Sequence, residues 1–195
     1  MSERREDILD AALAAFTANG YAATTIEQVR RGSGASVGSI YHRFGDKEGL
    51  AAALYVDCLR DYQRGATGVL TRHRNAEPGI KALVRHHLRW VEENPERARF
   101  LLDRREAEVA AAAAAEVREL NRATFAAVSE WLRPHEEAEA IRRMPRELLY
   151  AVVIGPAQEY SRHWLRDRMS AEMRRAELVL AQAAWDAVQG DAKGD

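Results

Sequence analysis

Five neighbouring residues combine small, polar and aromatic side chains, and their spacing predicts that they face outward from a helix. Ile40 and Phe44 are four residues apart, so they share one helix face and are expected to point to a core. The residues left on the outward side are Val37, Gly38, Ser39, Tyr41 and His42. These side chains have no core to fill, and their hydroxyl and imidazole groups can hydrogen-bond to a partner.

Lys47 is a second candidate for contact chemistry, because it is a cation in the first turn of a predicted helix capped by Asp46. A positive charge there opposes the helix dipole. A phosphate held by both the lysine and the free helix N–H groups would remove the conflict. The alternative is a solvated lysine whose charge is offset by Asp46 and Glu48.

Two short helices are predicted to position these residues. Thr24 and Glu27 have the spacing of a capping box, which predicts a helix over about residues 25–31 with Ile26 and Val29 inward. Gly32 and Gly34 are expected to end that helix, since glycine tolerates the left-handed conformation of a helix C-terminus.

Ser36 is expected to cap the second short helix, which Gly45 ends. Two short helices joined by a tight glycine-containing turn form the layout of a helix-turn-helix DNA reader. The pattern over residues 24–50 therefore predicts a DNA-contacting motif.

The rest of the chain also has helical periodicity, and its prolines mark the boundaries. Helices are expected over about residues 4–18, 47–73, 145–167 and 170–188. Three more are expected between residues 73 and 145: one begins at Pro78, a shorter one begins at Pro95, and a long one ends at about residue 133, where Pro134 closes it. No alternation typical of strands is found. We expect an all-α fold of about nine helices. Residues 1–50 would form a three-helix DNA-binding domain, 51–190 a larger helical effector-binding and dimerisation domain, and 191–195 a disordered tail.

Composition excludes several classes of protein. The 195-residue chain starts with a charged segment rather than a signal peptide, has no apolar run long enough for a membrane span, and has one cysteine, Cys58, so a cytoplasmic protein is expected. Adjacent His86 and His87 point to different helix sides and make a poor metal pair. No nucleophile–base set, metal cluster or phosphate loop is found, so we expect no enzyme activity, no metal and no cofactor.

Charge is a separate consideration. The first fifty residues hold six basic and seven acidic side chains: Arg4, Arg5, Arg30, Arg31, Arg43 and Lys47 against Glu3, Glu6, Asp7, Asp10, Glu27, Asp46 and Glu48. The first domain is thus not basic, which argues against an architectural protein that binds any DNA. Modest non-specific affinity makes dimerisation important for DNA binding.

The segments NGYAATTIEQV (19–29) and SVGSIYHRFGDKEGL (36–50) resemble the DNA-binding domain of the tetracycline-repressor (TetR) family of transcriptional regulators, with a further similarity at GPAQEYSRHWL (155–165). The resemblance implies a ligand-responsive repressor that binds a palindromic double-stranded DNA operator as a homodimer. It places the bases near Val37, Gly38 and Ser39, and phosphates near Thr25, Tyr41 and Lys47. The full set of expected DNA-binding residues is Thr24, Thr25, Ser36, Val37, Gly38, Ser39, Tyr41, His42 and Lys47.

The resemblance also implies a small-molecule effector site and a dimer interface. The candidate effector residues are aromatic or basic residues of the central helices: Trp90, Phe100, Arg104, Phe125, Tyr160, His163 and Trp164. The last two helices are apolar over a wide arc and need two partners. Their candidate dimer residues are Leu149, Val153, Leu178, Ala181 and Trp185. The alternatives are a non-specific architectural DNA-binding protein and a helical protein that binds other proteins rather than DNA.

Overall fold

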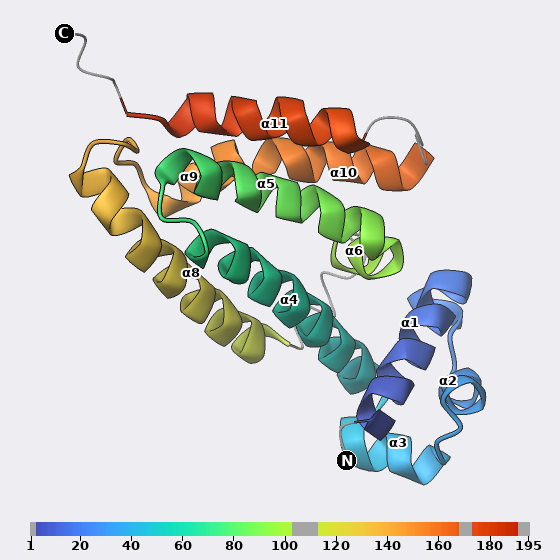
Figure 1. Ribbon diagram of the computed structural model, residues 1–195. Helices are drawn as coiled ribbons and strands as arrows, with labels where there is room; N and C mark the ends of the chain where they lie inside the picture. Colours follow the sequence, from blue (N-terminus) through green and yellow to red (C-terminus); the bar gives the residue numbers. More distant parts are fainter. Residues whose placement is uncertain (1–2, 103–112, 168–172, 191–195) are drawn as a thin grey trace, which may run out of the picture. The chain divides into compact units, whose positions relative to one another are not determined.

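The computed structural model describes residues 3–102, 113–167 and 173–190, and within these ranges the protein is helical and has no strand (Figure 1). A single isolated bridge joins Ile141 to Gln189. The helices are α1 (Glu3–Ala23), α2 (Ile26–Ser33), α3 (Val37–Phe44), α4 (Lys47–Thr71), α5 (Ala76–Glu93), α6 (Pro95–Leu102), α8 (Ala114–Glu137), α9 (Arg146–Val153), α10 (Gly155–Asp167) and α11 (Met173–Val188). The expected all-α class is confirmed.

The chain forms two compact units, and neither is continuous in sequence. The first contains residues 1–60 and 96–120, and the second contains 61–95 and 121–195. Helices α4 and α8 each contribute residues to both units. The domain bounds at residues 50 and 190 remain a prediction.

The core of the first unit consists of apolar side chains from α1 to α4, with one aromatic residue from α6. Ile8 and Leu9 of α1 are fully covered, as are Val29 of α2, Ile40 of α3 and Leu54 of α4. Phe100 of α6 stacks on Phe16 of α1, with ring centroids 5.9 Å apart. The short helices α2 and α3 are therefore anchored by one buried residue each, with Ile26 and Phe44 packed beside them, and their outer surface is available for other contacts.

In the second unit, α11 packs against α5 and α9, and α10 packs against the same two helices (Figure 1). Small residues allow this close approach: Ala157 of α10 and Ala181 of α11 are fully buried. Gly79 of α5 is required by packing, because a Cβ there would lie 2.3 Å from the Trp131 ring.

Three hydrogen-bonded side chains, in series, cross the apolar interior of the second unit. The Tyr62 hydroxyl lies 2.9 Å from Nδ1 of His87, and Nε2 of His87 lies 3.3 Å from the Ser161 hydroxyl. The Ser161 hydroxyl donates to the Ala157 carbonyl at 2.8 Å, so it accepts from His87, and Tyr62 then donates to Nδ1. The pKa of His87 is lowered to about 4, chiefly by burial and also by the neighbouring His86, so the imidazole is neutral near pH 7.

Two predicted helix boundaries differ from those in the structure. Pro134 lies inside α8, which continues to Glu137, and the Pro134 carbonyl accepts the Ala138 N–H at 3.1 Å. Proline removes its own N–H and crowds the preceding turn, but the residues after it keep their donors, so the helix continues for one short stretch to its end. The helix predicted over 145–167 is two helices, α9 and α10, which meet at Ile154 just before Gly155 and Pro156. The predicted start of the last helix at Ser170 lies outside the described residues.

Candidate nucleic-acid interface

Helix α2 starts with a reciprocal cap one residue later than predicted. The Thr25 hydroxyl accepts the Gln28 N–H at 3.3 Å, and the Gln28 side chain accepts the Thr25 N–H at 2.7 Å. The predicted pair of Thr24 and Glu27 is therefore wrong. Glu27 instead accepts hydrogen bonds from Arg30 and Arg31, and the Arg30 bond in particular holds the pKa of Glu27 below its ordinary value.

Thr24 is used inside the protein. Its side chain is buried, and its hydroxyl lies 2.8 Å from the Gly20 carbonyl and 3.0 Å from the Ala15 carbonyl. The chain turns there because Gly20 takes a non-helical conformation with φ of 77°. Thr24 thus fixes the approach to α2, and its hydroxyl is not offered to DNA as predicted.

The turn between α2 and α3 is closed by caps from both sides. Gly34 is left-handed, and its N–H donates to the Arg30 carbonyl at 3.0 Å. The Ser36 hydroxyl accepts the Ser39 N–H at 3.1 Å and begins α3. Ser36, expected at the DNA, therefore caps the helix with its hydroxyl.

Helix α3 presents the outward face that its spacing predicts. Ile40 is buried and Phe44 packs against the core, whereas Val37, Gly38, Tyr41 and His42 are exposed and Ser39 is half-buried. The side chains of this face are small or carry hydrogen-bonding groups. The geometry suits an element that lies in the major groove, where base edges and phosphates are within reach.

Gly38 has no packing reason to be glycine. A Cβ built at Gly38 meets no atom within 4 Å, and the residue lies in the first turn of α3 with no positive φ. Glycine in a helix costs about 0.5–1 kcal/mol relative to alanine. Since nothing inside the chain accounts for that cost, the space above Gly38 is a candidate for close approach by a partner.

Lys47 lies in the first turn of α4 and binds the end of α1. Its ammonium group donates to the carbonyls of Tyr21 at 3.0 Å, Ala22 at 3.2 Å and Thr24 at 3.1 Å, and lies 4.6 Å from the centre of the Tyr21 ring. These carbonyls belong to the last turn of α1 and to the residue just after it, where the carbonyls have fewer partners than inside a helix. An ammonium has three protons, so all three are used. The sequence suggested a phosphate ligand and missed this internal role, since its partners lie more than twenty residues away.

The candidate effector residues do not gather in one place. Trp90 is buried and donates to Asp61 at 2.9 Å, but Phe100 belongs to the core of the first unit and Phe125 is 47% exposed. Tyr160 and Trp164 pack against the core of the second unit. Of the other two candidates, Arg104 lies outside the described residues and His163 is exposed beside Glu159.

A groove of about 760 Å³ in the second unit has Trp90 in its wall and contains none of the other predicted effector residues. Its lining comes from α4, the turn that follows it, α5 and α11. Periodicity did not reveal it, because arginines spread over two helices and a turn look like solvated surface in the sequence.

The predicted dimer residues divide between interior and surface. Leu149, Val153 and Ala181 are buried in their own chain, so they are not available to a second copy. Trp185 packs partly against the same core, and Leu178 is 66% exposed. The apolar residues exposed on the same or neighbouring helices are Leu148, Tyr150 and Val179.

Other kinds of site were also considered. Among the described residues no three histidine, cysteine or carboxylate side chains are placed to hold a metal ion. None of the described helices combines the length and the apolar character that a membrane crossing needs.

Comparison with known proteins agrees with this geometry. Residues 8–54 match the family described as bacterial regulatory proteins, tetR family. The chain is similar to the HTH-type transcriptional repressor AcnR of Corynebacterium glutamicum, with 42% identity over 26% of this chain and 27% of the relative. AcnR of Corynebacterium diphtheriae is 35% identical to it, over 54% of this chain and 49% of the relative. The chain thus spans about a quarter to a half of the length of these curated relatives.

The whole fold resembles that of solved regulators. The transcriptional regulator FadR from Bacillus subtilis, solved in complex with stearoyl-CoA, superposes with a TM-score of 0.78 at 14% identity over 94% of this chain and 99% of that one. The described helices therefore have the arrangement found in such proteins, and the matched segment contains α2, the turn and α3. It is this segment, and not the rest of the chain, that matches the tetR family of bacterial regulatory proteins.

Proposed function

We propose that the protein is a ligand-responsive transcriptional repressor that binds a palindromic DNA operator as a homodimer and is released from it by a small-molecule effector. The observation that carries the proposal is the exposed face of α3, which is held by caps on both sides and has an unexplained glycine in its first turn. The match of this segment to the tetR family and the similarity to repressors support the proposal.

Contacts with DNA would divide into two kinds. Val37, Gly38 and Ser39 lie at the start of α3 and would approach base edges, with the Val37 side chain able to contact a thymine methyl group. Thr25 and Tyr41 are exposed and would bind phosphates, which fixes register without reading sequence. His42 would contact either.

The homodimer would use the exposed apolar face of α11. Leu178 and Val179 are 66% and 57% exposed, while the opposite face of α11 packs against α5 and α9. Two such faces in contact would remove both residues from water. One α3 reads only a few base pairs, and two held one turn of DNA apart, about 34 Å, read a palindrome.

Effector and operator would compete by linkage. An effector that binds better to a conformer with the wrong α3 spacing weakens DNA binding by the same factor that DNA weakens effector binding. Helix α4 is the element for transmission, because it carries Lys47 at its start and the polar residues Asp61 and Tyr62 further along.

The test is to titrate the purified protein against DNA flanking its own gene and against random DNA of equal length, at one salt concentration. A specific regulator should prefer one palindromic site by about 10³-fold or more, and a footprint should be two-fold symmetric. Equal affinity for both DNAs would support an architectural protein instead. Absence of binding to either would reject a DNA-binding role.

A further inference from the structure

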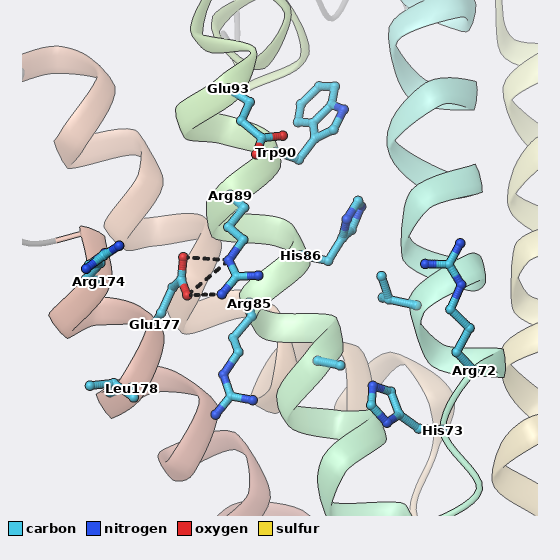
Figure 2. A pocket seen from close by; sticks show the side chains of 12 residues that line it. Arg72, His73, Arg85, His86, Arg89, Trp90, Glu93, Arg174, Glu177 and Leu178 are labelled. Atoms are coloured by element: carbon cyan, nitrogen blue, oxygen red, sulfur yellow. Dashed lines mark hydrogen bonds and ion pairs between the residues drawn. The ribbon is translucent and has the colours of Figure 1, made fainter.

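The groove of the second unit has helix α5 as its floor. Ala82, Arg85, His86, Arg89 and Glu93 recur at helical spacing along one face of α5. Val69 comes from α4 and Arg72 from the turn that follows it, and Arg174, Glu177 and Leu178 come from α11 (Figure 2). The volume of about 760 Å³ lies within the usual range of sites for organic ligands.

The lining carries a surplus of positive charge. It contains four arginines and two glutamates, which leaves two positive charges with the histidines neutral: Arg72, Arg85, Arg89, Arg174, Glu93 and Glu177. Only one of these arginines has an ion-pair partner inside the groove. Arg89 binds Glu177 through two nitrogens at 3.0 Å each, as the dashed lines of Figure 2 show.

Three arginines remain for a ligand. Within the described part of the chain, no hydrogen bond or ion pair engages the side chains of Arg72, Arg85 or Arg174. Arg72 comes from the turn after α4, Arg85 from α5 and Arg174 from α11 (Figure 2). Guanidinium groups bind phosphate or carboxylate in a two-pronged geometry, and three such groups around one groove favour a ligand with more than one negative charge.

His86, one of the two histidines that line the groove, forms part of its wall and adds no positive charge. His86 stacks on Tyr62, and its Nε2 lies 3.1 Å from the Tyr62 carbonyl, so Nε2 carries the proton and donates. Burial lowers the pKa of His86, which keeps the ring neutral. Gly65 makes this position possible, because a Cβ there would lie 2.3 Å from the ring.

The groove also has apolar surface beside the arginines. Val69, Ala82 and Leu178 contribute aliphatic side chains, and Trp90 contributes an indole whose N–H is bound to Asp61. Inorganic phosphate alone would leave this surface exposed to water. A ligand with an apolar or aromatic body attached to the charged group would cover it.

We propose that this groove binds a small organic dianion, such as a phosphate ester with an aromatic or aliphatic body, through Arg72, Arg85 and Arg174. The identification of this dianion as the effector rests on the proposed function; the binding itself does not. Because Leu178 lies both in the groove and on the exposed face of α11, a bound dianion would border the surface proposed for the dimer.

The test uses 1-naphthyl phosphate as the probe, titrated calorimetrically into the full chain without DNA. We expect saturable binding, and the double variant Arg85→Gln, Arg174→Gln should weaken it by about tenfold to a hundredfold, since hydrogen bonds to charged groups are lost. The uncharged analogue 1-naphthol should bind far more weakly to both proteins.

The matched control is the double variant Arg64→Gln, Arg133→Gln, which removes the same charge from exposed positions outside this groove. Its affinity for the probe should stay within about twofold of the wild type, because distant surface charges are screened. Equal weakening by both double variants, equal binding of 1-naphthol, or no binding by the wild type would each overturn the proposal.

A second arm separates the site from the regulatory role. The same proteins are mixed with operator DNA, and the probe should release DNA from the wild type but not from Arg85→Gln, Arg174→Gln. Probe binding by a protein that binds no DNA would keep the site and reject the repressor. Operator binding by a protein that binds no probe would keep the repressor and reject the site.

Discussion

Two exposed helix faces, on α3 and α11, differ in the chemistry that they offer. The face of α3 presents Gly38, Tyr41 and His42, with hydrogen-bonding groups and an approachable backbone. The face of α11 presents Leu178 and Val179, which can neither donate nor accept a hydrogen bond. Exposure alone therefore does not identify a partner. The first face suits a charged polymer in water, and the second suits a matching apolar surface.

The structures behind the two faces also differ. Behind α3, hydrogen bonds are made mainly by caps and by Lys47, and they fix the path of the backbone. In the second unit, the hydrogen bonds that link the side chains of Tyr62, His87 and Ser161 lie within the apolar interior and join α4, α5 and α10. The predictions below perturb one side of this comparison and leave the other intact.

The largest effect is expected for Leu178→Asp combined with Val179→Asp. Two carboxylates on the proposed interface would have to be desolvated in the dimer, so dimer affinity should fall by more than about a hundredfold. Sedimentation measures the oligomeric state, and tryptophan fluorescence checks the fold. A dimer that survives both charges would place the interface elsewhere.

Replacing Lys47 by methionine should destabilise the first unit by about 2 kcal/mol, because three carbonyls lose a charged donor. Amide exchange in α2 and α3 should accelerate. All four tryptophans, Trp90, Trp131, Trp164 and Trp185, belong to the second unit, so the unfolding signal from fluorescence should change little.

Tyr41→Phe is the matched control for Lys47, since it removes an exposed hydroxyl and leaves the scaffold intact. It should weaken DNA binding without changing amide exchange. If Lys47→Met instead left exchange unchanged and lowered the salt slope of DNA binding by about one, Lys47 would be a phosphate ligand, as the sequence suggested.

Stability of the second unit should depend on pH through His87. The pKa of His87 falls from 6.5 to about 4 on folding, so the unfolded chain binds the proton more readily than the folded one. The free energy of unfolding should therefore keep its whole His87 contribution above pH 6.5 and lose it as the pH falls toward 4. Between pH 7.5 and pH 5 the loss should be about 2 kcal/mol, measured by urea unfolding followed by tryptophan fluorescence. In His87→Gln this component should disappear; an undiminished pH dependence would assign it to other groups.

The smallest change in stability is expected for Gly38→Ala, which should stabilise α3 by up to about 1 kcal/mol because alanine favours helix. DNA binding should nevertheless weaken, since the added methyl group occupies the space left for the partner. Opposite changes in the two quantities would support a functional glycine. Unchanged operator affinity would show that the DNA backbone does not approach Gly38.

Features that depend on near neighbours could be predicted from the sequence. Ser36, Gly34 and Asp46 each act within four residues of themselves, and each was assigned correctly. The cap of α2 was one residue out because two consecutive threonines each have a glutamate or glutamine three residues later. The choice between them depends on the bend at Gly20, which turns Thr24 inward.

Features that depend on distant contacts could not be predicted. A wide apolar arc does not show which part of it faces the core, so Leu149 and Ala181 were assigned to the surface although they are buried. The arginines of the groove come from segments about a hundred residues apart, and Lys47 binds carbonyls that lie 23 to 26 residues earlier in the chain. No local pattern contains such pairs.

The contacts of Lys47 close a loop without a covalent bond. The segment from Tyr21 to Lys47 contains α2, the turn and α3, and its two ends are held together by one ammonium group. Loop closure restricts the ends more than the middle. Exchange of residues 26–44 for the matching segment of a relative should therefore transfer DNA preference as a unit, provided that Tyr21, Thr24 and Lys47 are kept.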